Sequence, residues 1–137
     1  MEQYATELHE LLIIDYDLVE IVQDGVALIE AVRRVLPDAI VCANDQMALG
    51  AIQELRAAGI RVPADISVTG FDDVYLGAML TPTLTTVHQP MWLLGERACS
   101  LLLERIADPS LPRRVEQLPT KLVIRESCGC GAAGQPT

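Results

Sequence analysis

Positive charge is scarce in this chain of 137 residues, which has 10 Lys and Arg against 19 Asp and Glu and a formal net charge of −9. Proteins that bind nucleic acid directly need clustered Lys and Arg against the phosphates. Here the basic residues are mostly single, with short pairs at Arg33-Arg34 and Arg113-Arg114. We therefore expect no direct contact of this chain with nucleic acid. The excess of acidic residues is typical of a solvated surface, and it does not exclude the binding of sugar-like or cationic ligands.

Long apolar runs and a leader sequence are also missing. No stretch approaches the roughly 20 apolar residues of a membrane span. The first ten residues, MEQYATELHE, lack the basic start and apolar run of a secretory signal. The sequence therefore predicts a cytoplasmic protein without membrane contact. Half of the residues are apolar, and a chain of this length can bury a real core, so we expect a folded domain.

The four cysteines do not form a metal-binding pattern. There is no C-x-x-C pair, and no histidine stands at ligand spacing from a cysteine, so no metal is predicted. Cys42 and Cys99 lie inside apolar patterns and are expected to be small core residues. Cys128-Gly129-Cys130 begins a glycine-rich tail, 128–137, that is predicted to be disordered. A labile metal site at this C-x-C remains the alternative.

Motifs for catalysis and for nucleotide cofactors are missing as well. Neither G-x-G-x-x-G nor G-x-x-x-x-G-K occurs, so no cofactor is predicted. No serine or cysteine nucleophile stands with a base, so no catalytic residues are assigned and the chain is not predicted to be an enzyme. A small enzyme that uses Asp72, Asp73 and His88 is a weaker alternative. Against it, the side chains of adjacent residues point apart, and a lone histidine is more often structural.

The segments that are present alternate between helix and strand patterns. Apolar residues at helical spacing predict helices, and short runs rich in β-branched residues predict buried strands. An α/β fold with a parallel sheet follows. The expected helices are the end of one at 4–12, then 25–36, 46–58 and 91–108, and the expected strands are 39–43, 66–71, 84–88 and 121–125, with 13–21 a loop or short strand.

Polar clusters follow three of these strands. They are Asn44-Asp45, Asp72-Asp73 and His88-Gln89. The carboxyl ends of parallel strands meet at one edge, where ligands of open α/β sheets bind. The amides of Asn44 and Gln89 can donate and accept, and the Asp72 carboxylate can bridge two hydroxyls. We therefore predict a site for a small polar molecule at Asn44, Asp72 and Gln89.

Structural roles are the alternatives for these residues. Asn44 and Asp45 can cap the following helix, which is the favoured interpretation for Asp45, and Asp72 can form an Asx-turn.

The irregular loop 74–82 holds the apolar residues Tyr75, Leu76, Met79 and Leu80, which form either a partner surface or a small lid on the core. Met91, Trp92 and Leu93, at the start of the last helix, are expected in the core.

Several motifs resemble the effector-binding domain of lactose-repressor (LacI/GalR) family transcription regulators. They are CANDQMALGAIQELRAAGIRVPADISVTGFDD, LTTVHQP, LLGERACSLLLERI and LPTKLVIRES, which are continuous from about 38 to 127. The resemblance implies a periplasmic binding protein-like (type I) fold, a parallel-sheet three-layer sandwich, in incomplete form. It also implies that Asn44, Asp72 and Gln89 contact a carbohydrate or nucleoside-like effector. Leu49 and the loop with Tyr75, Leu76, Met79 and Leu80 would then form a homodimer.

The resemblance further implies a division of the chain. Residues 1–89 would form the C-terminal subdomain of the effector domain without its first strand. Residues 90–118 would belong to the other subdomain, and 119–127 would return. The family's helix-turn-helix module and most of the first subdomain have no counterpart here, so a truncated chain or misplaced start is expected.

The resemblance implies that an effector allosterically controls DNA binding, through the missing helix-turn-helix domain. The SCGC ending also resembles sensor modules fused to signalling domains. A ligand-sensing module of a histidine kinase or cyclic-nucleotide synthase is therefore an alternative. A third possibility is that the fragment is only a dimerisation unit.

Overall fold

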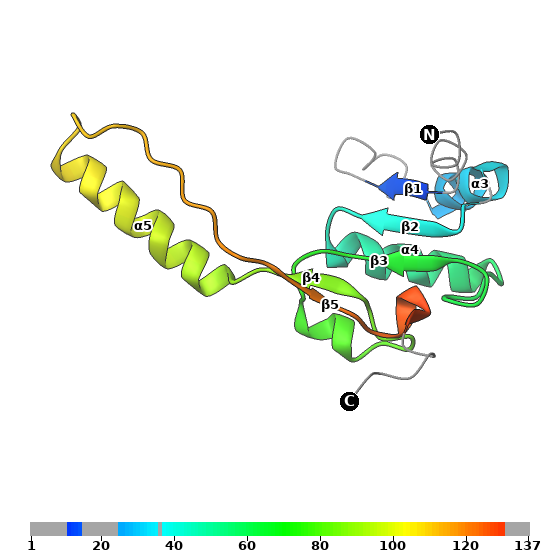
Figure 1. Ribbon diagram of the computed structural model, residues 1–137. Helices are drawn as coiled ribbons and strands as arrows, with labels where there is room; N and C mark the ends of the chain where they lie inside the picture. The colour runs from blue at the N-terminus through cyan, green and yellow to red at the C-terminus, as the bar shows by residue number, and fades with distance from the viewer. Residues whose placement is uncertain (1–10, 15–24, 36, 131–137) are drawn as a thin grey trace, which may run out of the picture.

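The computed structural model describes residues 11–14, 25–35 and 37–130 (Figure 1). Its first sheet has three parallel strands in the order β1-β2-β3: Leu11–Ile14, Ala39–Cys42 and Ser67–Thr69. Ile40 of the central strand stands opposite Leu12 on one side and Val68 on the other. The predicted α/β class with a parallel sheet is thus confirmed. The helix predicted over 4–12 is wrong for Leu11 and Leu12, which lie in β1, and its remaining residues lie outside the described ones.

Two helices connect these strands. Helix α3 spans Gly25–Val35 and helix α4 spans Asp45–Ala57, and the two contact each other. Helix α4 has Asn44 as its N-cap and is followed by Gly59, whose positive φ of 78° suits the chain reversal that glycine permits. Its apolar residues at helical spacing form the buried side as predicted at Ala48, Ala51, Ile52 and Leu55, whereas Ala58, just after the helix, is half-buried.

The core lies between these helices and the sheet. It includes Cys42, which is 2% exposed, as predicted from its apolar surroundings. Leu84 joins the core from the segment before β4. The buried apolar residues are Leu28, Val32, Ile40, Cys42, Ala48, Ala51, Ile52, Leu55, Ile66, Val68 and Leu84.

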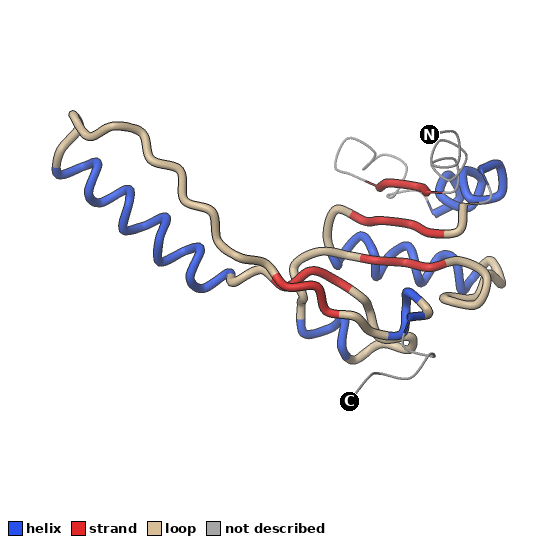
Figure 2. The backbone as a smooth tube through the Cα atoms, viewed as in Figure 1, coloured by secondary structure: helices blue, strands red, loops and turns tan. Residues whose placement is uncertain are grey.

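The second half of the chain adds a two-stranded antiparallel sheet (Figure 2). Strand β4, Thr86–His88, pairs with β5, Lys121–Val123, with Val87 opposite Leu122. Two isolated parallel bridges, Thr69 to Thr85 and Asp72 to His88, place the β4 segment beside the end of β3. The expected strands at 84–88 and 121–125 are confirmed in part, over 86–88 and 121–123.

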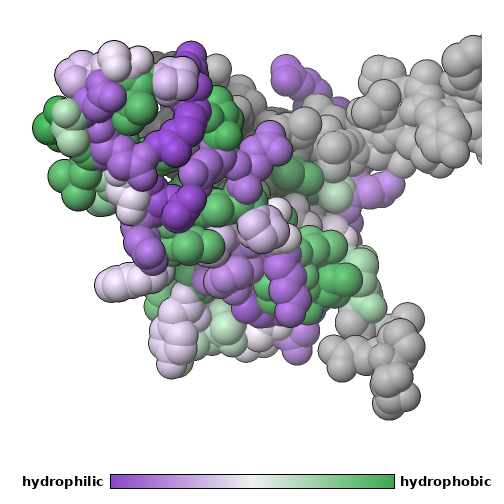
Figure 3. Space-filling model, turned by 60° about the vertical axis from the view of Figure 1, so that its left-hand side comes forward, coloured by the Kyte–Doolittle hydropathy of each residue, from purple (hydrophilic) through white to green (hydrophobic). Residues whose placement is uncertain are grey.

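Helix α5, Met91–Ala107, and the returning segment 108–120 form an arm that projects from the rest of the molecule (Figure 1). We use "arm" for residues 91–120. Ion pairs join the two halves of the arm, one between Arg97 and Glu116 and one between Arg114 and Glu104. No residue of α5 is buried. Figure 3, in which the arm comes forward at the upper left, shows hydrophobic and hydrophilic residues side by side on its surface.

The exposure of the arm overturns two predictions about the core. Met91, Trp92 and Leu93 are exposed, with Trp92 at 89%, and Cys99 is exposed too. The apolar spacing correctly predicted the helix, but most of its large apolar side chains stay exposed, and only Leu101 is half-buried, beside the returning segment at Leu111. None of the helices in these residue ranges is both long and apolar enough to cross a membrane.

The chain end begins with a short 3-10 helix, η4, at Glu126–Cys128. Ser127 is fully buried there, and its hydroxyl donates to the Val68 carbonyl at 2.6 Å while accepting from the Thr85 N–H at 2.8 Å. Residues 128–130, which were predicted to start a disordered tail, are therefore anchored through η4. The rest of the predicted tail, 131–137, lies outside the described residues.

Candidate functional site

The three polar clusters follow strand segments whose ends are joined by backbone hydrogen bonds. The Asp45 N–H donates to the Phe71 carbonyl at 2.8 Å, and the Asp72 N–H donates to the Val87 carbonyl at 3.0 Å. These bonds connect the segment after β2 to that after β3, and the latter to β4. The expected shared edge is therefore present in the backbone. We call Asn44, Asp72 and Gln89 the polar rim.

Asp72 and Gln89 face each other within this rim. The Gln89 Nε2 donates to Asp72 Oδ1 at 2.5 Å, and both residues are partly buried. Asp72 has a φ of 112°, a conformation that L-residues rarely adopt. Its N–H bond to Val87 helps to hold this backbone. The sequence separates the two residues by 17 positions, and the fold turns them into one hydrogen-bonding unit.

Asn44 serves as the N-cap of α4. Its Oδ1 accepts a hydrogen bond from the Met47 N–H at 2.8 Å, and its φ of −152° is extended, as usual for a cap. The alternative prediction that Asn44 caps the following helix is thus confirmed. The bond fixes the direction of the amide at the polar rim.

Asp45 has a role that the sequence did not reveal. It was interpreted as a helix cap, but it is the first residue of α4 and its carboxylate is completely buried. Its Oδ1 accepts from the Thr86 hydroxyl at 2.5 Å, and its Oδ2 accepts from the Val74 N–H at 2.8 Å. Asp45 therefore ties α4 to the Asp73-Val74 turn and to β4.

The space around this carboxylate is tightly packed. A Cβ added at Gly70 would lie 2.3 Å from Asp45 Oδ1, so only glycine fits there.

The buried Cys42 lies near the same carboxylate. Burial, with the nearby Asp45 charge, raises the pKa of the Cys42 thiol to about 12. Cys42 is therefore an inert core residue.

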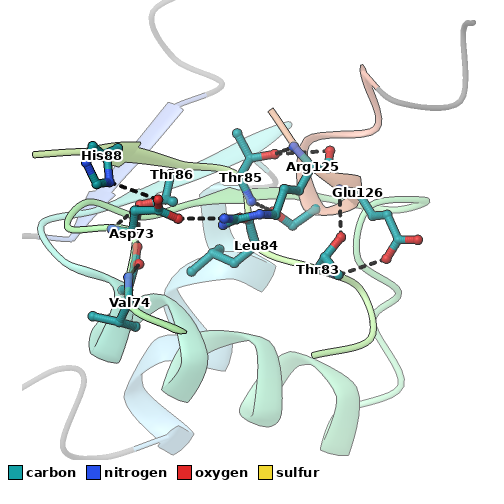
Figure 4. A network of polar contacts seen from close by, with 11 residues as sticks. Asp73, Val74, Thr83, Leu84, Thr85, Thr86, His88, Arg125 and Glu126 are labelled. Atoms are coloured by element: carbon teal, nitrogen blue, oxygen red, sulfur yellow. Dashed lines mark hydrogen bonds and ion pairs between the residues drawn. The ribbon is translucent and has the colours of Figure 1, made fainter. Parts of the chain in front are cut away.

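Asp73 lies at the centre of a second network (Figure 4). The Arg125 Nη2 donates to Asp73 Oδ1 at 2.6 Å, and His88 Nδ1 lies 3.0 Å from Asp73 Oδ2. Burial raises the pKa of Asp73, but the hydrogen bonds from Arg125 and His88 outweigh it and leave the pKa below its ordinary value. Arg125 also donates to the Leu84 carbonyl at 2.8 Å.

This network bears on the enzyme alternative. Asp72 bonds to Gln89, whereas Asp73 bonds to Arg125 and His88, so the two adjacent carboxylates serve different partners, as expected. His88 is hydrogen-bonded, as a structural histidine would be. Arg125 was not predicted as part of a network, because a single arginine in a strand pattern gives no signal of its partner. In the part of the chain that the structure describes, no three potential metal ligands cluster.

The predicted partner surface divides into exposed and half-buried residues. Tyr75, Leu76 and Met79 are 78%, 59% and 64% exposed around the 3-10 helix η3, Tyr75–Ala78. Leu49 and Leu80 are half-buried, and Leu49 packs against the core. The loop therefore does not cover the core as a lid with Tyr75, Leu76 and Met79, because these three side chains point into solvent.

A groove of about 500 Å³ lies along the first turns of α5, beginning two residues after Gln89. Its walls are mainly apolar, with one acidic side chain. The lining residues are Met91, Trp92, Gly95, Glu96 and Cys99. This open apolar space lies at the base of the arm and is lined by α5 alone, without a residue of the polar rim.

The chain is similar in sequence and structure to known regulators. The family described as "Periplasmic binding protein-like domain" matches residues 4–128. The HTH-type transcriptional repressor PurR of Aliivibrio fischeri (strain MJ11) is 45% identical over 104 residues, covering 76% of this chain and 30% of the repressor. The chain thus spans about a third of the length of this curated relative.

Two solved structures show the same relationship. The complex of the transcriptional regulator CelR with cellobiose superposes with a TM-score of 0.74 at 28% identity, covering 87% of this chain and 46% of that one. The lac repressor dimer bound to operator and the anti-inducer ONPF gives a TM-score of 0.63 at 34% identity, covering 77% and 33%.

The parallel sheet, its polar strand ends and the family match define the class of this protein as periplasmic binding protein-like. The chain belongs to that domain family, in the form found in LacI-family transcription regulators, and corresponds to the C-terminal part of their effector-binding domain. The resemblance stated from the sequence motifs is confirmed.

Proposed function

We propose that the polar rim of Asn44, Asp72 and Gln89 binds a carbohydrate or nucleoside-like effector. The observation that carries this proposal is the Asp72–Gln89 pair at 2.5 Å, held at the shared edge of the strands. A carboxylate that already accepts an amide N–H is oriented before the ligand arrives. It can then accept hydrogen bonds from neighbouring hydroxyls of a sugar, while the amides donate or accept. The cellobiose complex of a relative supports a sugar-like ligand.

The arm supplies a second part of the proposed site. Residues 1–89 and 119–127 would form the C-terminal subdomain, and 90–118 would dock into the other subdomain of the whole regulator. The uncovered apolar residues of α5 support this division, because a helix with this pattern normally packs against another element. The groove beside Met91 and Trp92 would then lie near the entrance of the closed site.

Effector binding would change the affinity of the regulator for DNA by shifting the equilibrium between two arrangements of the subdomains. An effector that binds one arrangement of the subdomains more tightly than another shifts the population toward the first. We propose that the intact cytoplasmic regulator is a homodimer whose helix-turn-helix domain contacts the operator. The operator-bound dimer of a relative supports this arrangement.

The test is isothermal titration of the full-length regulator against a panel of carbohydrates and nucleosides. At least one ligand should bind the unaltered protein, and Asp72→Ala should weaken that binding by about 1–3 kcal/mol, since a buried polar group of the ligand loses its partner. Asp65→Ala is the matched control, because Asp65 pairs with Arg61 away from the polar rim. If Asp72→Ala and Asp65→Ala bind as tightly as the unaltered protein, the site assignment is wrong.

A further inference from the structure

The C-x-C motif at Cys128-Gly129-Cys130 lies apart from the polar rim. The Cys128 carbonyl accepts a hydrogen bond from the hydroxyl of Ser67 at 3.2 Å. Ser67 is the first residue of β3, whereas Asp72 follows the opposite end of that strand. The preceding residue, Ser127, is buried and bonded to β3 and to Thr85. The motif is therefore anchored at the amino edge of the sheet, and the proposed function makes no use of it.

The backbone folds the two cysteines toward each other. Gly129 has a φ of 73° and a ψ of −6°, and the Gly129 N–H donates to the Glu126 carbonyl at 2.9 Å. These dihedrals are left-handed, and the mirror image of α-helical geometry puts the flanking Cα atoms about 5.5 Å apart. This separation falls within the range of roughly 4.4–6.8 Å that disulfides span.

The sulfur atoms lie within this turn. The Cys130 N–H donates to Cys128 Sγ at 3.3 Å, and the Cys130 thiol donates to the Cys128 carbonyl at 3.6 Å. Cys128 is half-buried and Cys130 is exposed, so a small reagent can reach the pair. The other two cysteines differ in environment, because Cys42 is buried in the core and Cys99 lies on the distant arm.

The two thiols are chemically unequal. Burial raises the pKa of Cys128, but hydrogen bonds with Thr85 and Cys130 outweigh it, so the pKa lies below that of an ordinary thiol. The hydrogen bond and charge of Cys128 raise the pKa of Cys130. The thiolate is the nucleophile in thiol–disulfide exchange, and the Cys130 N–H already donates to the Cys128 sulfur. Both observations favour Cys128 as the attacking sulfur and Cys130 as the resolving one.

We propose that Cys128 and Cys130 form a reversible dithiol–disulfide pair that exchanges with low-molecular-weight disulfides. Cys128 thiolate attacks one sulfur of the reagent, forming a mixed disulfide and releasing the first thiolate. Cys130, after losing its proton to water, attacks the Cys128 sulfur and releases the second thiolate. The protein loses two electrons and two protons, and the reagent disulfide is reduced to two thiols.

Closing this bond changes the local structure. The Cys128 sulfur accepts the Cys130 N–H and its thiol also donates to the Arg125 carbonyl at 3.5 Å. Once this sulfur is half of a disulfide, the three sulfur contacts of the turn must rearrange. The Cys128 carbonyl is the acceptor for Ser67, which connects the change directly to β3. The pair is therefore a modification site whose redox state reaches the edge of the sheet opposite the polar rim.

Mass spectrometry of the reduced chain, incubated with oxidised glutathione, tests this proposal. Cys99→Ser serves as the background, because Cys99 is exposed but lies outside the motif. We expect a product lighter by two hydrogen atoms, with the 128–130 peptide cross-linked and no retained glutathione. Adding Cys130→Ser should instead trap one glutathione on Cys128, and adding Cys128→Ser should abolish the cross-linked product. All forms should return to the starting mass with dithiothreitol.

Two further measurements keep the outcome decisive. Gly129→Ala, which disfavours the positive φ, should slow ring closure and accumulate the mixed disulfide, while circular dichroism reports whether the fold persists. A stable glutathione adduct on both cysteines of the Cys99→Ser protein, without the cross-linked product, would overturn the proposal. Attack at Cys130 before Cys128 would overturn the assigned order.

Discussion

At the residue scale, Asp45 shows how one carboxylate can organise a ligand-binding edge. It is fully buried, yet both oxygens have partners, Thr86 on β4 and the Val74 N–H beyond the Asp73 turn. The helix start, the turn and β4 are thereby held together. Since Asp72 lies two residues before Val74 and Gln89 three residues after Thr86, Asp45 indirectly positions the polar rim.

The first prediction concerns this buried carboxylate. Asp45→Ala should lower the free energy of unfolding by about 3 kcal/mol, because the Val74 N–H and the Thr86 hydroxyl lose a charged acceptor. Urea denaturation followed by circular dichroism measures the change. Asp38→Ala, at an exposed position, is the matched control and should leave the midpoint almost unchanged. Equal, small effects for the two variants would show that Asp45 does not hold the edge together.

The second prediction concerns pH and Asp73. Its pKa is below the ordinary 3.8, since hydrogen bonds from Arg125 and His88 outweigh the effect of burial. A group with a lowered folded-state pKa stabilises the fold fully above its ordinary pKa, and this contribution is lost as the pH falls through the lowered value. Asp73→Asn should therefore be less stable than the unaltered protein near neutral pH, with a gap that narrows in acid.

Urea midpoints at a series of pH values test this expectation. Asp38→Asn serves as the control for removing one exposed carboxylate. A stability gap for Asp73→Asn that stays constant from neutral pH to strong acid would contradict the role of the Arg125–Asp73–His88 network.

At the element scale, most helices and strands of the described residues could be predicted from sequence. Periodic apolar residues indicated α3, α4 and α5, and β-branched runs indicated β2, β3 and β4. Errors arose where tertiary contacts decide. Trp92 and Leu93 carry the signal of a core helix, but both are exposed, because α5 lies on the projecting arm and has no buried residue. Ser127 carries the signal of a polar tail, but β3 and Thr85 satisfy its hydroxyl and so allow it to be buried.

The candidate site was predictable in position but not in its internal contacts. Strand ends in a parallel sheet must share an edge, so Asn44, Asp72 and Gln89 could be grouped without coordinates. The buried partners of Asp45 and the Arg125–Asp73 pair come from residues 29 to 52 positions apart. No local pattern encodes such pairings.

The third prediction concerns how η4 is fastened to the sheet. Ser127→Ala should lower the free energy of unfolding by about 2 kcal/mol, because the Thr85 N–H loses its acceptor and the Val68 carbonyl loses a donor in a buried place. Denaturation with urea gives the value. Ser110→Ala, on the exposed arm, is the control and should have little effect. No difference between the two variants would mean that η4 is not fastened through Ser127.

At the scale of the whole molecule, the described part of the chain exposes apolar side chains in more than one place, and two of these groups bear on association. One is around η3, with Tyr75, Leu76 and Met79, and the other runs along α5. Contiguous exposed apolar residues of this kind mark sites of association. We propose that the first forms the dimer interface and that the second packs on the other subdomain, so substitutions in the two should have different consequences.

The fourth prediction separates these surfaces. Leu76→Glu should raise the dimer dissociation constant of the full-length regulator by about tenfold or more, since a charge would be buried in the interface. Ile106→Glu, at a position on α5 that is also well exposed, should leave the dimer intact. Light scattering across a concentration series measures both. A dimer that survives Leu76→Glu and dissociates with Ile106→Glu would reverse the assignment.

A double-mutant cycle between Asp72 and Gln89 tests the effector site most directly. Titration calorimetry of the full-length regulator with its tightest ligand from the panel would compare Asp72→Ala, Gln89→Ala and the double variant. Two side chains that hold each other and touch one ligand should couple by on the order of 1 kcal/mol, so the double variant should lose clearly less than the sum of the single losses. Binding that is unaffected by either substitution, or losses that simply add, would contradict a shared effector site at the polar rim.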